Sequence, residues 1–372
     1  MKKLRMAVVG AGRLGGFHAQ KIAARDDVQL VAVADPLPAS RNRVAAECRA
    51  EAVADCSELF GRIDAAVVAS PTTLHHRIAR DLIEAGVHVL VEKPLCTTLA
   101  EADELAAAAK QKNVVLQVGH VERFNPAFEA ISSQIGEPKY IEAVRTSGFT
   151  FRSTDVGVVL DVMIHDIDLV LALAGSPLRK VEALGFSVLG GHEDVANARL
   201  EFESGCVATL SASRVSYESI RRMSAWSAKG FAAIDFAART ATRVYPSEAL
   251  VHREFHVESL TPEQVEHYRG HLAEEHLPRE QMAFDAVDAL ALELGDFVTS
   301  IRNARRPRVD GQAGRDALAA AEWILDRIDA HCWDASLDGP AGPLALPRRH
   351  VIPTPHYSPA AIPSPAYHEK AG

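Results

Sequence analysis

Residues 4–15 read LRMAVVGAGRLG, and this stretch decides the fold of the first part of the chain. Leu4–Val9 is a short apolar run of the kind that forms a buried strand. It leads straight into Gly10, Gly12 and Gly15, which are spaced as G-x-G-x-x-G and are followed by a helical pattern. In such a motif the first glycine makes a tight turn, the second lets the backbone approach a ligand, and the third lets helix and strand pack closely.

An acidic residue follows this motif at the distance that a nucleotide site requires. The second apolar strand, Val28–Ala34, ends at Asp35, which lies 20 residues after Gly15. Strand, glycines, helix, strand and acid in this order form the dinucleotide-binding fingerprint, in which the acid accepts hydrogen bonds from ribose hydroxyls. The charge of Asp35 repels a 2′-phosphate, so NAD is expected rather than NADP. Arg41 and Arg43 would soften that preference.

The alternation of strands and helices continues through the first third of the chain. Further strands are expected at Ile63–Ala69, Val87–Val91 and Val114–Val118, with helices at Leu74–Ala85 and Leu99–Lys112. Strands that alternate with helices predict a parallel, doubly wound sheet, that is, a Rossmann-type α/β domain. Ligands bind such sheets at the carboxyl ends of the strands.

Two of these strand ends carry polar side chains. Ser70 and Thr72 follow one strand, where their hydroxyls can meet a diphosphate or a ribose. Glu92 and Lys93 end the next strand, and a proline then stops the ladder. A lysine in this position can face both a nicotinamide and a substrate hydroxyl. The alternative is a lysine that is simply solvated.

Two histidines open the helix that follows Ser70. His75 and His76 fall in its first turn, and we expect both mainly on the surface, with His75 as a further candidate for the cofactor. The residues expected at the cofactor are therefore Gly10, Gly12, Arg13, Leu14, Gly15, Asp35, Ser70, Thr72, His75, Glu92 and Lys93.

An apolar helical segment of the expected second domain, Val156–Ala174, carries acids and a histidine. Asp161 and His165 are four residues apart and share a helix face, which Asp168 joins, while Asp166 points elsewhere. A carboxylate beside a histidine fixes one tautomer and raises basicity, which suits a general base. The alternatives are a surface charge network and a metal site. Two acids and one histidine without an H-E-x-x-H motif are an incomplete ligand set, so no metal is expected.

The later part of the chain alternates with a period of two. Strands are expected at Pro138–Thr146, Val181–Leu189, Ala196–Phe202, Val207–Val215, Arg222–Ala228, Phe231–Phe236 and Thr240–Tyr245. Their short connections predict a large, mainly antiparallel open sheet, with one face on helices and the other free to join subunits into a homodimer or homotetramer. Residues 247–280 are expected to be an irregular insertion, followed by helices near Ala283–Asn303 and Gly314–Ala330.

These patterns divide the 372 residues into a Rossmann α/β domain (1–122), an α+β domain (123–332) and a proline-rich tail (333–372) that is expected to be poorly ordered.

The net charge of -9 argues against nucleic acid and anionic membranes as partners. Five cysteines without a C-x-x-C pair favour reduced thiols in the cytoplasm. The apolar runs are too short for a membrane span or a signal peptide.

Taken together, these motifs resemble the Gfo/Idh/MocA family of oxidoreductases. The resemblance rests on the glycine motif with Asp35, on Glu92-Lys93-Pro94, on Asp161-x-x-x-His165 and on the closing stretch 301–311. It covers about residues 4–330. Within the family, residues 119–126 (GHVERFNP) are similar to the UDP-N-acetylglucosamine 3-dehydrogenase branch. The resemblance implies an NAD-dependent dehydrogenase that acts on a ring carbinol of a sugar or sugar nucleotide.

The resemblance also implies roles for single residues. Lys93, Asp161 and His165 match the family's catalytic set, and these three with Arg123 and Asp168 are expected to bind substrate. We expect His165 to take the hydroxyl proton, Asp161 to orient it and Lys93 to stabilise the alkoxide, with the roles of lysine and histidine open to exchange.

A sugar-nucleotide diphosphate needs cations in the site. The candidates are Arg123, Arg145, Arg152, Arg214, Arg221 and Arg222. Two alternatives remain for the function: a myo-inositol 2-dehydrogenase-like cyclitol dehydrogenase, and an NAD(P)-binding regulator without turnover.

Overall fold

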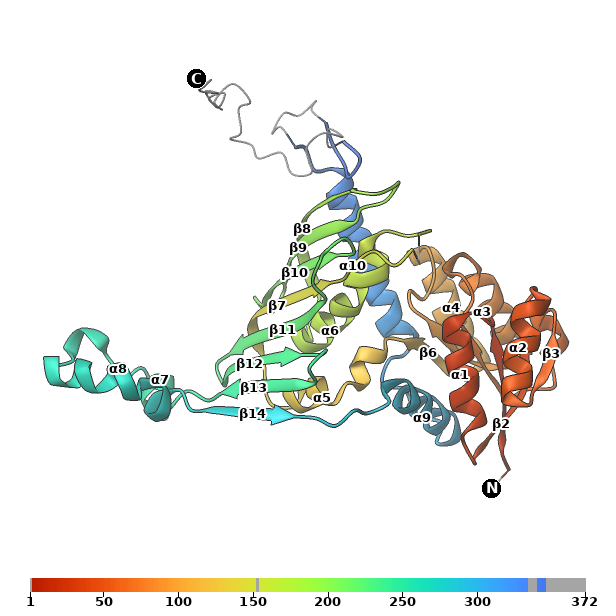
Figure 1. The fold of residues 1–372 in the computed structure, drawn as a ribbon, viewed down its shortest axis with the longest axis horizontal. Helices are drawn as coiled ribbons and strands as arrows, with labels where there is room; N and C mark the ends of the chain where they lie inside the picture. The colour runs from red at the N-terminus through yellow and green to blue at the C-terminus, as the bar shows by residue number, and fades with distance from the viewer. Residues whose placement is uncertain (1, 152–153, 334–339, 346–372) are drawn as a thin grey trace, which may run out of the picture.

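A computed structural model describes residues 2–151, 154–333 and 340–345 of the chain. It contains a six-stranded and an eight-stranded sheet that lie side by side, with helices between them (Figure 1). The predicted pairing of a Rossmann-type sheet with a second, mainly antiparallel sheet is confirmed. Most of the proline-rich tail lies outside the described residues.

The first sheet is parallel throughout, with the strand order β3-β2-β1-β4-β5-β6. Its strands are β1 (Leu4–Val9), β2 (Val28–Ala34), β3 (Glu51–Val53), β4 (Ala65–Val68), β5 (His88–Glu92) and β6 (Leu116–Gly119). Its helices are α1 (Arg13–Ala23), α2 (Pro38–Cys48), α3 (His75–Glu84) and α4 (Leu99–Lys112). The strand order reverses between β1 and β4, and the carboxyl ends on either side of that point open a crevice for a ligand.

Both faces of this sheet are covered, which explains why its strands are continuously apolar. Met6 and Val8 of β1 belong to one buried cluster, and Ala7 and Val9 belong to the cluster on the opposite face. Helix α9 (Ala289–Arg302) comes from far along the chain, yet its buried side chains complete the first of these clusters. The late part of the chain therefore returns to the first sheet.

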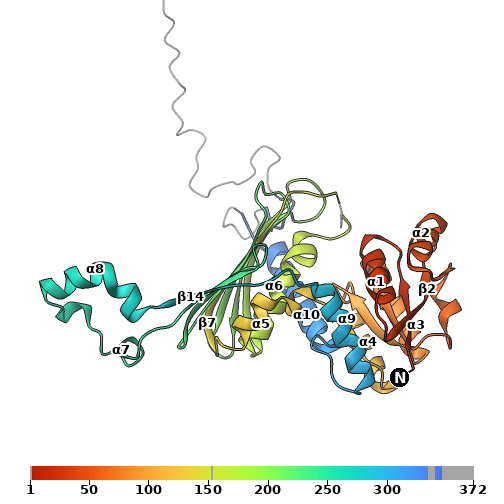
Figure 2. The ribbon, with the colours of Figure 1, turned by 60° about the horizontal axis from the view of Figure 1, so that its bottom comes forward.

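The second sheet has the order β14-β13-β12-β11-β7-β10-β9-β8, and only its β7–β10 pair is parallel. Its strands are β7 (Pro138–Thr146), β8 (Leu178–Phe186), β9 (Val195–Phe202), β10 (Val207–Ser213), β11 (Ile220–Ser227), β12 (Gly230–Asp235), β13 (Thr240–Val244) and β14 (Arg279–Ala283). Helices α5 (Pro126–Ser132), α6 (Ile164–Ala174) and α10 (Gly311–Asp329) lie on one of its sides (Figure 2).

Residues 247–278 form an arm that projects from the edge of the second sheet between β13 and β14 (Figures 1 and 2). The arm carries α7 (Glu248–Val251) and the 15-residue helix α8 (Pro262–His276), so the expectation of an irregular insertion was wrong. Helix α8 starts at a capping box in which Thr261 and Gln264 bind each other's backbone N–H groups. None of its residues is buried, so capping and local contacts hold the helix.

Short helical turns complete the described structure. The 3-10 turns are Cys56–Leu59, Thr72–Leu74, Val121–Phe124 and Val257–Ser259, and a π-helical turn spans Val159–Met163. Within the described ranges, no helix is both long enough and apolar enough to cross a membrane.

Candidate active site

The glycine motif builds the cradle that its spacing predicts. Gly10 has φ +102°, and a Cβ there would lie 2.5 Å from the carbonyl oxygen of Ala69, so only glycine fits. A Cβ on Gly15 would lie 1.8 Å from the carbonyl oxygen of Gly10. A Cβ on Gly12 would meet no atom within 4 Å. The open space beside Gly12 is where a bound diphosphate can approach the backbone.

The surroundings of Gly12 fit an NAD molecule. Among the described residues, no side chain caps the N-terminus of α1, so its first N–H groups are available to phosphate oxygens. The carboxylate of Asp35 accepts hydrogen bonds from the N–H groups of Ala11 at 2.7 Å and Leu37 at 2.8 Å, and it keeps further lone pairs for a ribose.

A groove of about 330 Å³ extends this cradle toward the adenosine side. It is lined by Ala11, Gly12, Arg13, Gly16, Phe17, Gln20, Ser40 and Arg43. Arg41 instead donates to the backbone carbonyls of Asp35 and Pro36. Of the two arginines that follow Asp35 in sequence, Arg43 is therefore the one that reaches the groove.

His75 lies in a different place from the expected helix surface. The residue is fully buried, and its two ring nitrogens lie 2.9 Å from the carbonyl oxygens of Ser70 and Pro94. The first turn of α3 points into the protein at this position, so the ring joins the ends of two neighbouring strands. Ser70 and Thr72 lie beside it, half-buried. His76 is half-buried and binds Glu104.

Lys93 reaches from the end of β5 to the segment that precedes α6. Its Nζ donates to the backbone carbonyl of Asp161 at 2.7 Å and to the carboxylate of the same residue at 3.2 Å. Asp161 lies in the π-helical turn Val159–Met163, which precedes α6 and widens the helix locally. This pair brings together two residues that are 68 positions apart in sequence.

Asp161 does not orient His165 in the way that helical spacing suggests. In the described part of the chain, the carboxylate of Asp161 is hydrogen-bonded to Lys93 alone, and His165 Nδ1 has no partner. The π-helical turn shifts the register, so residues four apart no longer lie directly above each other. Burial, and then the charges of Lys93 and Arg145, lower the pKa of His165 well below its ordinary value. The imidazole is therefore neutral at pH 7.

The other acids of this segment form buried ion pairs. Asp168 accepts hydrogen bonds at 2.7 and 3.0 Å from Arg123, so each is the other's partner, and neither lines the cavity beside Lys93. Asp166 points elsewhere, as its position predicts, and binds Arg145. The expectation that Arg123 and Asp168 contact substrate thus has no support in this geometry.

A cavity of about 1000 Å³ lies between the two sheets, and Lys93, Asp161 and His165 line it. Arg13, Leu14 and Phe17 of α1, Glu92 and the strand end at Thr146–Thr150 also line it. Its size suits a nicotinamide and a substrate together.

The candidate arginines differ sharply in their freedom to bind a ligand. Arg145 is buried and forms ion pairs with Asp166 and Glu122, and Arg214 is buried and forms an ion pair with Asp194. Arg222 pairs with Asp235 at the surface, and Arg152 lies outside the described residues. Arg221 lines the cavity, and within the described ranges it has no side-chain hydrogen bond or ion pair. Arg221 is therefore the cation best placed for an anionic substrate.

A buried cluster of titratable side chains lies behind Lys93, and the sequence motifs did not predict it. His18 of α1 contacts Glu92 at 2.6 Å, and Glu293 of α9 lies beside them. His120 is also fully buried, next to His165, with neither ring nitrogen hydrogen-bonded in the described structure. A glutamate on the apolar face of a helix is the one signal that would have pointed to Glu293.

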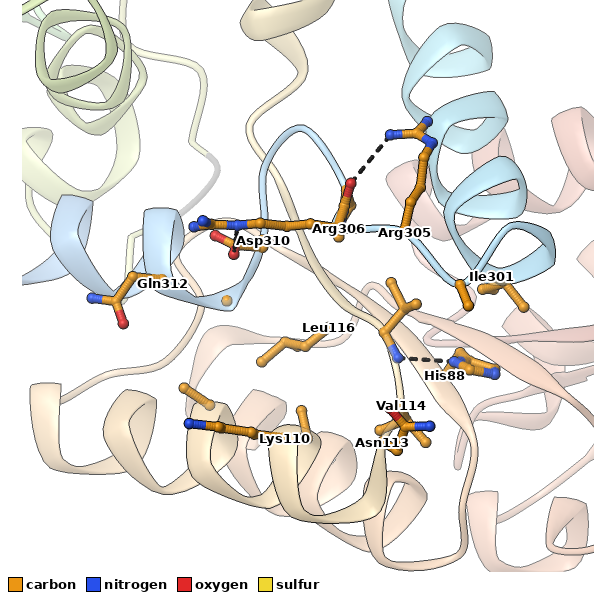
Figure 3. A pocket seen from close by; sticks show the side chains of 16 residues that line it. His88, Lys110, Asn113, Val114, Leu116, Ile301, Arg305, Arg306, Asp310 and Gln312 are labelled. Atoms are coloured by element: carbon orange, nitrogen blue, oxygen red, sulfur yellow. Dashed lines mark hydrogen bonds and ion pairs between the residues drawn. The ribbon is translucent and has the colours of Figure 1, made fainter. Parts of the chain in front are cut away.

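A second groove, of about 610 Å³, lies at the opposite end of β5 (Figure 3). His88, which begins β5, Lys110 and the arginines that follow α9 line it. Arg305 pairs with Asp296 and Arg306 pairs with Asp310. The groove lies at the amino ends of the strands, away from the glycine motif and Lys93, and its arginines already have partners.

Comparisons with known proteins agree with this geometry. Residues 4–120 match the model of an oxidoreductase family with an NAD-binding Rossmann fold, and residues 129–232 match the GFO/IDH/MocA C-terminal domain. UDP-N-acetylglucosamine 3-dehydrogenase of Acidithiobacillus ferrooxidans is 35% identical over 334 residues, which are 89% of this chain and 99% of that protein. The solved structure of that enzyme aligns with a TM-score of 0.77 over the same shares of the two chains.

Other relatives carry related names. A scyllo-inositol 2-dehydrogenase (NAD(+)) of Bacillus subtilis is 31% identical over 58% of this chain and 68% of that protein. The structure of scyllo-inositol dehydrogenase from Lactobacillus casei, with bound NAD(H) and scyllo-inositol, aligns with a TM-score of 0.69 at 21% identity, covering 88% of this chain and 97% of that one, and shows the shared fold. The chain belongs to the Gfo/Idh/MocA family of NAD-binding oxidoreductases.

Proposed function

We propose that this oxidoreductase oxidises a ring hydroxyl of a sugar nucleotide, of the UDP-N-acetylglucosamine type, with NAD as hydride acceptor. The observation that carries the proposal is the cavity between the sheets. It combines Lys93 and His165 with Arg221, a cation that has no partner in the described residues. The similarity to UDP-N-acetylglucosamine 3-dehydrogenase over nearly the whole of that enzyme supports the same substrate class.

The cofactor would be held by the glycine cradle, by the first N–H groups of α1 and by Asp35. When bound there, NAD supplies the hydride acceptor, and the protein supplies position and proton transfer. The exposed apolar side chains Leu14 and Phe17 line the same cavity and shield the nicotinamide side from water.

Proton transfer falls to His165 in this proposal. Its neutral imidazole can accept the hydroxyl proton as the carbinol is oxidised. Lys93 donates a hydrogen bond to the same oxygen and stabilises the negative charge that develops on it. Asp161 keeps the lysine ammonium aimed into the cavity. We retain Lys93, Asp161 and His165 as the proposed catalytic set.

The diphosphate is assigned to Arg221. A guanidinium can form two parallel hydrogen bonds to phosphate oxygens, and that of Arg221 has no competing carboxylate in the described structure. An uncharged cyclitol has no use for this cation, which favours a sugar nucleotide over inositol. Arg221→Ala should raise the KM for a UDP-sugar about tenfold or more and leave NAD binding unchanged.

The direct test is NADH formation by the purified protein with UDP-N-acetylglucosamine, its uronate, myo-inositol and free glucose. Turnover with the UDP-sugars alone supports the proposal. Turnover with myo-inositol alone would replace it by a cyclitol dehydrogenase. Tight NAD binding with no turnover on any compound would point to a regulator, which has no need of the Lys93–Asp161 pair.

We further propose that residues 1–122 and 123–332 act as cofactor and substrate domains, and that copies of the chain associate through the second sheet. On the side of this sheet opposite α5, α6 and α10, none of the described helices covers the strands (Figure 2). Free cysteines at all five positions fit a protein that works in the reducing cytoplasm.

A further inference from the structure

Three buried titratable side chains meet directly behind Lys93. His18 comes from α1, Glu92 ends β5, and Glu293 comes from α9. One nitrogen or carboxylate oxygen of each lies within 4.8 Å of the others, and each residue is more than nine-tenths buried. The cluster therefore joins three elements at the base of the proposed alkoxide-binding lysine.

The three side chains have unequal partners. His18 Nε2 lies 2.6 Å from one carboxylate oxygen of Glu92, and the other oxygen accepts the N–H of Lys93 at 3.3 Å. Neither carboxylate oxygen of Glu293 has a hydrogen-bond partner in the described structure. An ionised carboxylate in such a place would lose its hydration and gain nothing in return.

The charges around Glu293 also oppose its ionisation. The titratable groups that face it are Glu92 from β5, His18 from α1 and Asp296 from its own helix; β6 contributes only the amide of Gln117, which binds the Glu293 backbone carbonyl at 3.0 Å. Burial, and then the charges of Glu92 and Asp296, raise the pKa of Glu293 well above its ordinary value. Burial and the neighbouring carboxylates thus both favour the neutral, protonated form of Glu293.

One histidine and two glutamates are also a set of metal ligands. Here, however, the His18 nitrogen nearest the acids already binds Glu92. A cation would have to break that contact, whereas a proton on Glu293 relieves the repulsion between the two acids and leaves the contact intact. The geometry favours the proton.

We propose that Glu293 is a positioning residue for Lys93, acting through Glu92. This inference rests on the proposed role of Lys93. While Glu293 is neutral, Glu92 remains hydrogen-bonded to His18 and to the N–H of Lys93. The lysine ammonium then remains hydrogen-bonded to Asp161. An ionised Glu293 repels the Glu92 carboxylate. This repulsion displaces the turn that carries Lys93, so it slows the chemical step without lowering the affinity for NAD.

The turnover test compares wild type, Glu293→Gln and Glu293→Leu as full-length proteins, with NAD and UDP-N-acetylglucosamine. Wild-type kcat should fall as the pH rises through the raised pKa, and Glu293→Gln should lack this fall because an amide cannot ionise. Glu293→Leu, which cannot ionise either, should also lack this fall, with the Kd for NAD unchanged. Glu263→Gln, on the exposed face of α8, is the matched control. An unchanged alkaline fall in Glu293→Gln would overturn the proposal.

A second measurement needs no turnover. Burial raises the pKa of Glu293 in the folded protein above its ordinary value of 4.5, which it has when unfolded. Its stabilising contribution is therefore fully present below pH 4.5 and is lost as the pH rises through the folded-state pKa. The Tm of the wild type should fall relative to Glu293→Gln over this window.

The outcomes of this second measurement separate the two proposals. Parallel Tm curves, or a stoichiometric divalent metal that Glu293→Gln loses, would contradict a protonated Glu293. Diverging curves together with a fully active Lys93→Ala variant would instead reject the proposed function and keep the neutral acid.

Discussion

Lys93 is held in place before any substrate arrives. It donates to the carbonyl and to the carboxylate of Asp161, and its side chain is only 17% exposed. A preorganised cation of this kind stabilises a developing alkoxide more than a solvated lysine does, because it need not reorient during the reaction. The contact with Asp161 shows that Lys93 is not simply a solvated lysine, and it fits the proposed role of Lys93 at the alkoxide.

Replacing this cation tests its role. Lys93→Ala should lower kcat by about 10²–10³-fold, the usual cost of losing one donor to a developing oxyanion. The Kd for NAD should change little, because the glycine cradle is untouched. Lys110→Ala, an exposed lysine in the groove of Figure 3, is the control. Steady-state kinetics and NAD titration measure both, and full activity of Lys93→Ala would reject the assignment.

Asp35 should set the choice between NAD and NADP. Asp35→Ala removes the acceptor for the ribose and also frees the N–H groups of Ala11 and Leu37. We expect the Kd for NAD to rise about tenfold or more. The preference for NAD over NADP should shrink, because the repelling charge is gone while Arg43 remains in the groove. Fluorescence titration with both dinucleotides measures this, and unchanged values would remove Asp35 from the ribose site.

The lowered pKa of His165 predicts the acid side of the pH profile. A general base must be neutral, so activity is present above its pKa and is lost as the pH falls through it. Because burial and neighbouring cations lower this pKa below 6.5, the acid limb of kcat/KM should lie below pH 6.5. If the acid limb of kcat/KM lay above pH 6.5, or persisted in His165→Gln, the hydroxyl proton would be accepted by another group.

At the level of elements, the sequence predicts most of the fold. The glycine motif, the strand-end acids and the period-two runs locate nearly all strands, and β7 is predicted to the residue at Pro138–Thr146. These signals are local, because each strand carries its own apolar pattern. Helix α8 was missed although Thr261, Pro262 and Gln264 form a recognisable helix start. Helix α8 has no buried residues, so its sequence lacks the apolar periodicity by which helices are recognised.

The site was less predictable than the fold, for physical reasons. The sequence singles out Lys93, Asp161 and His165, because strand ends and helix faces can be located from spacing. It cannot show that a π-helical turn moves Asp161 onto Lys93, because that turn depends on tertiary contacts. Nor can it show that Glu293 returns to Glu92 from 201 positions away (293 minus 92).

The π-helical turn depends on one such contact. A buried carboxylate oxygen of Glu193 accepts the N–H of Val159 at 3.0 Å, and Gly157 leaves room for it. A Cβ on Gly157 would lie 2.0 Å from that carboxylate, so Gly157→Ala should displace Glu193. We expect a loss of about 1–3 kcal/mol in stability together with a lower kcat. Gly190→Ala, with no atom within 4 Å of the added Cβ, is the control for thermal unfolding and activity. Equal behaviour of the two variants would contradict this account.

At the scale of the whole molecule, the late part of the chain ties the two sheets together. Helix α10 packs in the core of the second sheet, while α9 completes a face of the first. The proposed catalytic set spans the same junction. Lys93 follows β5 of the first sheet, whereas Asp161 and His165 lie in the helical segment that packs on the second sheet. Packing that fixes the two sheets relative to each other also fixes the distance between lysine and histidine.

The uncovered face of the second sheet makes a prediction for the assembly. Tyr140, Trp226 and Phe231 form an aromatic group on neighbouring strands, with ring centroids 5.2 and 4.8 Å apart, and Trp226 is 37% exposed. Aromatic side chains on a broad sheet face are typical of the centre of a subunit interface.

Trp226→Glu tests this face. It would place a charge in that interface and weaken association by about 2 kcal/mol or more. Light scattering after gel filtration should show an oligomer for the wild type and for Tyr217→Glu, a fully exposed loop control, but a shift toward monomer for Trp226→Glu. A wild type that is monomeric at every concentration, or a variant that remains oligomeric, would exclude this face as the interface.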